Sequence, residues 1–246
     1  MKKYRYLLLD LDNTLFDFDR AEETAFYAAF SASGLTADGA VYEAYHEIND
    51  RLWKRLERGE VTRERLKHLR YEQLFALFGW EDDGRSSKIS EDYFLLLSEQ
   101  KFLLPGAEEV CRRLRENYAL YIVTNGTYSV QLRRFCGSPV EPYITEMFVS
   151  EKLGAAKPSR EYFEKVIRAV GDEDLSHYCV IGDSLSSDIA GAAAIGIDAV
   201  WLDRAGSGDT RGLPVVHILE DIRQLPAFLQ ECDEQQERTE KNENEL

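Results

Sequence analysis

Along most of this chain, short strand-like apolar runs alternate with longer segments in which apolar residues recur at helical spacing. The strand-like runs lie at residues 7–10, 118–123, 148–149, 178–181, 199–202 and 215–218. Helical spacing marks residues 107–115, 160–170, 188–195 and 221–231. Strand, loop, helix, strand is typical of a parallel sheet wrapped by helices. The pattern therefore predicts an α/β fold built around a parallel sheet.

The segment between the first two strand candidates does not follow this alternation. Residues from about 20 to 100 carry leucines at helical spacing with many Arg and Glu residues between them, and they contain no strand candidate. We therefore expect a sheet domain formed by residues 1–17 and 101–232, with an inserted all-helical cap over residues 18–100. The alternative is an ordinary first set of helices packed on the sheet.

The last residues have a different composition. The stretch DEQQERTEKNENEL, residues 233–246, has no apolar residue before the final leucine and carries six acids and two bases. Such a segment cannot bury enough apolar surface to offset the entropy of ordering it. We expect a disordered acidic tail there.

Charge and hydropathy exclude several classes of protein. The formal net charge of −15 argues against a protein that binds nucleic acid or an anionic membrane without specificity. No apolar run approaches the roughly 18 residues of a membrane span. The start MKKYRYLLLD has two lysines before an apolar run, but charges follow at once and no small-residue cleavage site appears, so it is interpreted as a strand. The four cysteines are widely spaced with no CxxC pair, as in ordinary reduced thiols. We expect a cytoplasmic protein.

Two aspartates stand where the first strand ends. Asp10 and Asp12 follow an apolar run, and an unpaired buried carboxylate costs several kcal/mol. In an open parallel sheet, ligands bind at the carboxyl ends of the strands. That rule brings Thr124 and Asp183, which follow later strands, to the same place. Lys157 precedes Pro158 and should project from a loop, because the residue before proline is pushed towards an extended conformation.

These side chains form a set suited to phosphoryl chemistry. Asp10, Asp183 and Asp188 suit a hard cation with oxygen ligands, above all Mg²⁺. A carboxylate held near a metal and Lys157 is ionised and can act as a nucleophile. A second carboxylate two residues on, Asp12, can serve as general acid and then base. Thr124 and nearby backbone N–H groups can hold phosphoryl oxygens.

Each residue also has a structural explanation. Asp10 and Asp12 can be solvated acids at a strand end, and Thr124 can form the turn before Asn-Gly. A lysine before a proline is common. Asp188 can cap the helix that follows it, and this role is compatible with one in the site.

The four segments together resemble the four ordered motifs of the haloacid dehalogenase superfamily. They are Asp10-Leu-Asp-Asn-Thr14, Thr124-Asn125-Gly126, Lys157-Pro158 and Gly182-Asp183-Ser-Leu-Ser-Ser-Asp188, and the resemblance spans about residues 5–230. It implies a three-layer Rossmann-like core with a helical cap and a Mg²⁺ cofactor. Two positions depart from the pattern: Asn13 replaces a common glycine, and Phe18 stands where many capped members have serine. Asn tolerates left-handed backbone geometry, so the turn should survive.

The resemblance also implies a role for each motif residue. Asp10 becomes the nucleophile and Asp12 the acid/base. Thr124, Asn125 and Lys157 bind the phosphoryl group. The metal ligands are Asp10, Asp183 and the backbone carbonyl of Asp12, and Asp188 supports the site.

Within this superfamily the motifs favour a phosphatase. Dehalogenases of the family lack the second acid, so Asp12 disfavours dehalogenation, whereas a sugar phosphatase or a phosphomutase stays open. The finer resemblance is to bacterial nucleoside-monophosphate phosphatases that act on pyrimidine 5′-nucleotides. It rests on FDFD after the first motif, Asn49-Asp-Arg-Leu-Trp53 with Gly59, SEKLGAAKP and Gly196-Ile-Asp-Ala-Val-Trp201.

Aromatic residues near the first motif and in the cap are candidates for contact with a nucleobase. Phe16, Phe18 and Trp53 can present ring faces to a base, and such stacking contributes roughly 1–3 kcal/mol. The alternative for Trp53 is an apolar stripe with Leu52 and Leu56 that packs the cap. Trp201 is expected in the core.

A different class of function shares much of this site. A phospho-acceptor signalling module also uses an acidic cluster, a Thr or Ser and a Lys on a similar sheet. Asp12 argues against it, because an acid that activates water shortens the life of the phosphoenzyme. We expect an enzyme whose partner is a small phosphorylated metabolite such as a nucleotide, not nucleic acid or membrane, and which is a monomer or homodimer.

Overall fold

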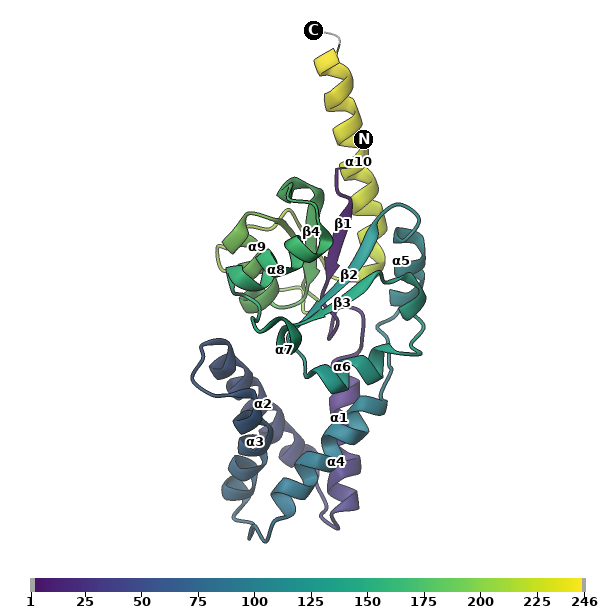
Figure 1. The fold of residues 1–246 in the computed structure, drawn as a ribbon. Helices are drawn as coiled ribbons and strands as arrows, with labels where there is room; N and C mark the ends of the chain where they lie inside the picture. Colours follow the sequence, from purple (N-terminus) through teal and green to yellow (C-terminus); the bar gives the residue numbers. More distant parts are fainter. Residues whose placement is uncertain (1–2, 245–246) are drawn as a thin grey trace. The chain divides into compact units, whose positions relative to one another are not determined.

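The computed structural model describes residues 3–244 as two compact units (Figure 1). The first comprises the N-terminal residues up to Asp17, then Phe102–Tyr128 and the chain from Phe135 on. The second comprises Phe18–Lys101 together with Ser129–Arg134. The short second piece of the helical unit was not predicted, because nothing in the pattern separates it from the elements around it.

The first unit contains a six-stranded parallel sheet with strand order β3-β2-β1-β4-β5-β6. The strands are β1 Tyr6–Leu9, β2 Ala119–Thr124, β3 Glu146–Val149, β4 Tyr178–Gly182, β5 Asp198–Leu202 and β6 His217–Leu219. The predicted α/β fold with a parallel sheet is confirmed. Strand order reverses beside β1, which pairs with both β2 and β4, and ligands of open α/β sheets bind at such a point.

Both faces of the sheet are buried under helices, which explains why its strands are nearly continuous apolar runs. Alternate residues face opposite sides, so Leu7 and Leu9 lie in one core cluster and Leu8 in the other. Helices α5 Ala107–Leu114 and α10 Leu225–Asn244 cover the first face, and α8 Arg160–Val170 and α9 Ala190–Ile195 cover the second (Figure 1). This gives the three layers expected.

Shorter elements lie between these helices and strands along the chain. They are α6 Tyr128–Phe135, α7 Ser150–Leu153 and 3₁₀ turns at Glu141–Tyr143, Leu175–His177 and Ile222–Gln224. The sequence predicts one helix over 188–195. The structure has instead a π-helical turn, Leu185–Ile189, before α9 begins at Ala190.

The second unit is helical, as expected for the inserted segment. Its helices are α1 Phe18–Ala32, α2 Gly39–Glu57, α3 Arg63–Phe78 and α4 Arg85–Glu99. Asp38 caps α2 by accepting from the Val41 N–H at 3.0 Å, and Thr62 caps α3 by accepting from the Arg65 N–H at 3.2 Å. Helix α1 packs on α4, and α3 packs on both α2 and α4.

The interior of the helical unit is polar at its centre. Buried Glu22 of α1 accepts from the Asn49 amide at 2.7 Å and contacts His46 Nδ1 at 2.9 Å, both on α2. Arg70 of α3 donates to Asn49 Oδ1 and to the Tyr45 hydroxyl, both at 3.1 Å. The chain of contacts from Arg70 through Asn49 to Glu22 links three helices and compensates the buried charges.

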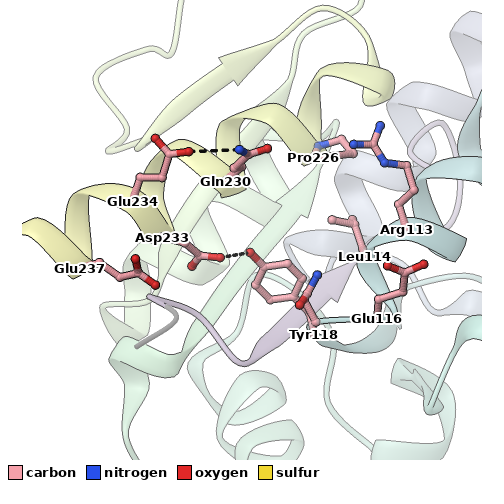
Figure 2. Close-up of a pocket in the computed structure, with 10 residues that line it drawn as sticks. Arg113, Leu114, Glu116, Tyr118, Pro226, Gln230, Asp233, Glu234 and Glu237 are labelled. Atoms are coloured by element: carbon pink, nitrogen blue, oxygen red, sulfur yellow. Dashed lines mark hydrogen bonds between the residues drawn. The ribbon is translucent and has the colours of Figure 1, made fainter.

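The end of the chain corrects one expectation. The sequence predicts a disordered tail from residue 233, but α10 continues to Asn244. Asp233 is buried and accepts from the Tyr118 hydroxyl at 2.6 Å and from the Lys3 N–H at 3.0 Å. Tyr118 and Asp233 line a cavity of about 400 Å³ with Glu234 and Glu237 (Figure 2). The helix persists because the segment has no Pro or Gly and is rich in Glu and Gln, which are good helix formers.

Two further expectations concern thiols and membranes. Cys111, Cys179 and Cys232 are buried, Cys136 is exposed, and all four are free thiols, as predicted. Among residues 3–244, we find no helix with the length and apolar character that crossing a membrane requires.

Candidate active site

The predicted site residues gather where β1, β2 and β4 end. Asp10 directly follows β1, Thr124 is the last residue of β2, and Asp183 directly follows β4. Because Leu9 pairs in register with both Ile122 and Ile181, these three strand ends lie next to one another. The sheet therefore places the first, second and fourth motifs at one edge.

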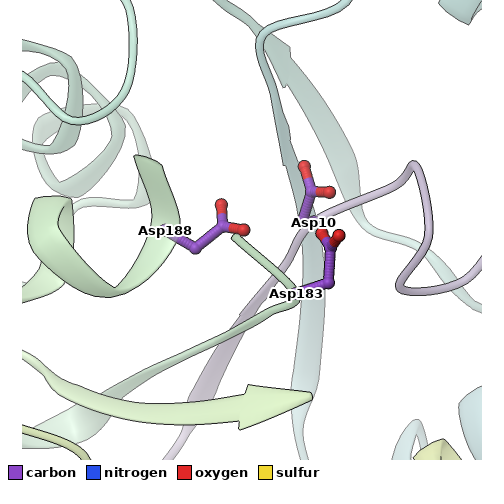
Figure 3. A group of neighbouring side chains, drawn as sticks. All are labelled: Asp10, Asp183 and Asp188. Atoms are coloured by element: carbon purple, nitrogen blue, oxygen red, sulfur yellow. The ribbon is translucent and has the colours of Figure 1, made fainter. Parts of the chain in front are cut away.

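Three carboxylates converge at this edge (Figure 3). One oxygen from each of Asp10, Asp183 and Asp188 lies within 4.8 Å of the others. Asp10 and Asp188 are buried, and Asp188 has no exposed surface. This is the set of acids that the sequence places around a hard cation.

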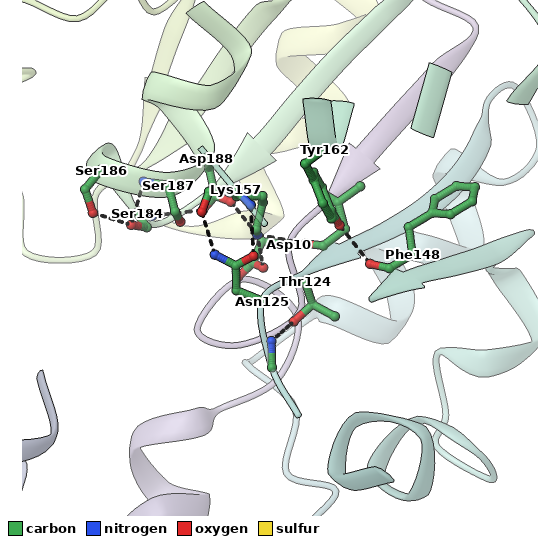
Figure 4. A network of polar contacts seen from close by, with 12 residues as sticks. Asp10, Thr124, Asn125, Phe148, Lys157, Tyr162, Ser184, Ser186, Ser187 and Asp188 are labelled. Atoms are coloured by element: carbon green, nitrogen blue, oxygen red, sulfur yellow. Dashed lines mark hydrogen bonds and ion pairs between the residues drawn. The ribbon is translucent and has the colours of Figure 1, made fainter. Parts of the chain in front are cut away.

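Lys157 lies in the middle of the buried acids (Figure 4). Its Nζ donates to Asp10 Oδ1 and to Asp188 Oδ1, both at 2.6 Å, and to the Val123 carbonyl at 2.8 Å. Burial by itself lowers the pKa of Lys157, but the charges of Asp10 and Asp188 outweigh it and raise the pKa above its usual value. The lysine is therefore a permanent cation in the site.

One lysine does not balance three acids. Burial raises the pKa of Asp10 well above its usual value; Lys157 opposes this rise, and the neighbouring aspartates add to it. Burial and the charge of Asp188 raise the pKa of Asp183 to about 7. A second positive charge would stabilise all three carboxylates in their ionised form. Clustered carboxylate oxygens with excess negative charge are the donors that Mg²⁺ prefers, so the residues present fit this ion.

The loop that carries Lys157 is attached to the second motif. The Asn125 side chain donates to the Lys157 carbonyl at 2.8 Å and accepts from the Lys157 N–H at 3.0 Å. The Lys157–Pro158 peptide bond is cis. We predicted Asn125 as a phosphate-binding residue. Its side-chain amide binds the Lys157 backbone and so positions the lysine.

Thr124 and Asp12 flank the clustered acids. Thr124 is buried, and its hydroxyl accepts from the Gly126 N–H at 3.1 Å, which shapes the turn at the end of β2. Asp12 is partly exposed and lies in a turn. The turn is closed by hydrogen bonds that the Leu15 and Phe16 N–H groups donate to the Leu11 carbonyl. Asn13 adopts a left-handed conformation with φ of 59°, as expected for a residue that replaces glycine there.

Asp188 approaches the strand end closely because of a glycine. The Ser184 N–H donates to Asp188 Oδ2 at 3.1 Å. A Cβ placed on Gly182 would lie 2.2 Å from that same oxygen, so any side chain there would displace the carboxylate. In the sequence, Gly182 is recognised only as part of a motif. The need for glycine at this position is seen only from its contact with Asp188.

The aromatic candidates for substrate contact separate into two groups. Phe16 is wrong as a stacking residue: it has no exposed surface and packs in the core cluster under the sheet. Phe18 and Trp53 belong to the helical unit, where Arg134 lies over the Phe18 ring at 5.6 Å and Arg63 over the Trp53 ring at 5.5 Å. Trp201 is buried, as predicted.

Comparisons with known proteins agree with this geometry. A family model described as haloacid dehalogenase-like hydrolase matches residues 4–196. The chain is 35% identical to the HAD-hydrolase YfnB of Bacillus subtilis over 203 residues, covering 82% of this chain and 86% of that protein. It is 36% identical over 199 residues to the pyrimidine 5′-nucleotidase PynA of Streptococcus pneumoniae, covering 80% of this chain and 83% of PynA. The crystal structure of YfnB bound to magnesium superposes with a TM-score of 0.87 at 31% identity, over 93% of this chain and 99% of that one.

Proposed function

Because this chain belongs to the haloacid dehalogenase-like hydrolases, we propose that it is a Mg²⁺-dependent phosphatase that hydrolyses nucleoside 5′-monophosphates through an aspartyl-phosphate intermediate. The observation that carries the proposal is Lys157 Nζ at 2.6 Å from both Asp10 and Asp188. It places a cation against a buried carboxylate at the end of β1, two residues before a second acid. This is the arrangement that a nucleophile and an acid/base pair require.

In the first half of the reaction, an Asp10 carboxylate oxygen attacks the phosphorus of the ester. The bond from phosphorus to the ester oxygen breaks, and Asp12 gives its proton to that oxygen as the alcohol leaves. In the second half, water attacks the phosphorus of the aspartyl phosphate while Asp12 accepts a proton from it. The bond from phosphorus to Asp10 then breaks, which releases inorganic phosphate and restores both acids.

The remaining residues bind and orient the phosphoryl group. The Thr124 hydroxyl, the Asn125 backbone N–H and Lys157 Nζ supply donors for its oxygens, and Asn125 also fixes the Lys157 loop. Asp10, Asp183 and the Asp12 carbonyl would hold the Mg²⁺ ion, with Asp188 in support. When bound, the ion neutralises charge on the phosphoryl oxygens and balances the acids that Lys157 leaves uncompensated.

The nucleotide substrate is proposed from the similarity to PynA, whose name states a pyrimidine 5′-nucleotidase activity. Phe18 and Trp53 of the helical unit are the aromatic residues proposed to contact the base. Stacking on one ring contributes roughly 1–3 kcal/mol, which favours a nucleotide over a sugar phosphate by about 5- to 150-fold.

The test is phosphate release from p-nitrophenyl phosphate, nucleoside 5′-monophosphates and sugar phosphates, with Mg²⁺ and with EDTA. We expect metal-dependent turnover that is lost in Asp10→Asn and kept in Asp19→Asn, a control on an exposed acid at the start of α1. A higher kcat/KM for sugar phosphates would overturn the nucleotide assignment alone. A parent protein inactive on every ester with Mg²⁺ present would overturn the phosphatase assignment, and a long-lived phosphoprotein would then indicate a phospho-acceptor module.

A further inference from the structure

One peptide group in the site is held at both of its ends. The Trp201 indole Nε1–H donates to the Asp183 carbonyl at 2.8 Å. The N–H of the same peptide group, which belongs to Ser184, donates to Asp188 Oδ2 at 3.1 Å. The peptide between Asp183 and Ser184 therefore connects an indole on one strand with a buried carboxylate of the candidate cation site.

Trp201 is well placed to fix this peptide. It lies on β5, in register with Gly182 at the end of β4, and its ring packs in the core cluster on the second face of the sheet. Its side chain is buried, so the direction of its N–H is set by packing. A buried indole N–H needs an acceptor, and the Asp183 carbonyl supplies it.

The orientation of this peptide affects how two acids lie relative to each other. A rotation of the peptide plane would change ψ of Asp183, and with it the position of the segment from Ser184 to Asp188 relative to the Asp183 side chain. The same rotation would turn the Ser184 N–H away from Asp188 Oδ2. The other oxygen of that carboxylate, Oδ1, accepts from Lys157 Nζ. Hydrogen bonds in series also polarise one another, so a donor at the carbonyl strengthens the bond from the N–H to Asp188.

We propose that Trp201 is a positioning residue for the divalent-cation site: its indole N–H locks the Asp183–Ser184 peptide and so sets the relative positions of the Asp183 and Asp188 carboxylates. This inference rests on the proposed function, since it assumes that these acids hold Mg²⁺. Gly182 completes the arrangement, because only a residue without Cβ lets Asp188 reach the Ser184 N–H.

The experiment compares Mg²⁺ binding to the parent with binding to two variants that lack the indole donor. The first variant is Trp201→Phe. The second replaces Trp201 with benzothienylalanine, which keeps the size of the ring system and exchanges the N–H for sulfur. Trp80→Phe is the matched control, because Trp80 belongs to the helical unit and packs there on Phe75 and Phe78, whereas the acids belong to the sheet unit. Mg²⁺ affinity is measured by calorimetric titration of the metal-free full chain without substrate.

We expect both variants at Trp201 to bind Mg²⁺ about tenfold more weakly, as for other residues that orient metal ligands, and Trp80→Phe to bind as the parent does. With saturating Mg²⁺, the KM for p-nitrophenyl phosphate should stay at the parent value while kcat falls. The benzothienyl variant decides the matter if Trp201→Phe does not fold.

Two other outcomes are distinguishable. If the parent binds Mg²⁺ and hydrolyses esters but the benzothienyl variant binds Mg²⁺ with the parent's affinity, the positioning role is overturned and the proposed function stands. If the parent itself binds no Mg²⁺, the proposed metal-dependent function fails and the positioning role fails with it.

Discussion

Lys157 Nζ and Asp10 Oδ1 lie 2.6 Å apart, and the lysine side chain is 2% exposed. A second contact of the same length joins the lysine to Asp188. Removing one partner of a buried ion pair leaves an uncompensated charge and costs far more than the pair contributes. The stability of the site and its chemistry therefore depend on the same nitrogen.

Lys157→Met should abolish phosphatase activity and destabilise the sheet unit. At about pH 7 we expect a loss of roughly 3–5 kcal/mol in the free energy of unfolding, measured by urea denaturation, because buried carboxylates lose their cation. Burial raises the pKa of Asp10 and the charge of Lys157 opposes this rise, so removing the lysine ammonium group raises the pKa of Asp10 further. A carboxyl group with a raised folded-state pKa destabilises the protein at neutral pH and not in acid. The difference in unfolding free energy between Lys157→Met and the parent should therefore narrow towards about pH 4.

The control for this variant is Lys152→Met. Lys152 is exposed on α7 and lies over the Tyr128 ring, apart from the acids. It should keep both activity and stability. Equal stability of the two variants at neutral pH would contradict the compensating role assigned to Lys157.

Asp12→Asn should separate the two halves of the reaction. With p-nitrophenyl phosphate the leaving group needs no proton, so Asp10 can still be phosphorylated, whereas hydrolysis of the aspartyl phosphate lacks its base. We expect a burst of p-nitrophenolate equal to the enzyme concentration, followed by turnover at least about 100-fold slower than the parent. Stopped-flow absorbance measures the burst, and mass spectrometry of the intact protein detects the added phosphoryl group.

Asp10→Asn is the comparison for that experiment and should show neither burst nor phosphoprotein. Slow turnover of Asp12→Asn without a burst and without phosphoprotein would mean that Asp12 does not act in the second step.

The positions of the strands along the chain and the gathering of the motifs could be predicted, because they depend on local pattern and on one topological rule. Asp10, Thr124 and Asp183 each follow an apolar run, and parallel strands bring such ends together. The direction of a side chain in the folded site depends instead on contacts between distant segments. The Asn125 side chain donates to the Lys157 carbonyl, and the Trp201 indole donates to the Asp183 carbonyl. These residues are far apart in the sequence, and hydrophobic periodicity gives no information on such contacts.

Phe16 illustrates the same limit. Its position after Asp12 predicts a residue near the site, yet the segment that returns from the helical unit covers it. Phe16 forms a β-bridge with Leu103, and the Leu104 N–H donates to the Leu15 carbonyl at 2.9 Å. A contact between residues so far apart in the chain buries the ring in the core.

His46 makes the stability of the helical unit depend on pH. Its hydrogen bond to Glu22 raises the pKa of His46; burial opposes this, and the charges of Glu22, Asp19 and Asp50 add to it. Because the folded-state pKa is raised, the stabilisation is complete below the unfolded value of about 6.5 and is lost as pH rises through the folded value. The difference in unfolding free energy between the parent and His46→Asn should therefore be largest in mild acid and shrink with rising pH.

The measurement is a series of urea denaturation curves across this pH range for the parent and for His46→Asn. A difference in unfolding free energy that stays constant with pH would show that the contact with Glu22 does not depend on the charge of the imidazole.

Truncation of α10 tests whether the acidic end of the chain is part of the fold. Ending the chain after Glu231 removes Cys232, which packs in the core, and Asp233, which accepts hydrogen bonds from the Tyr118 hydroxyl and the Lys3 N–H. Leaving the hydroxyl of buried Tyr118 without its acceptor costs about 1–3 kcal/mol, so this truncation should lower the free energy of unfolding by at least that amount. Ending the chain after Glu237 keeps both contacts and should leave stability unchanged, because the residues beyond it with described side chains are exposed.

If both shortened chains unfold at the same urea concentration as the full chain, the end of α10 contributes nothing to the fold, and the boundary predicted from composition is the better one. A loss confined to the shorter chain would place the edge of the core at Asp233, where the Tyr118 hydroxyl binds.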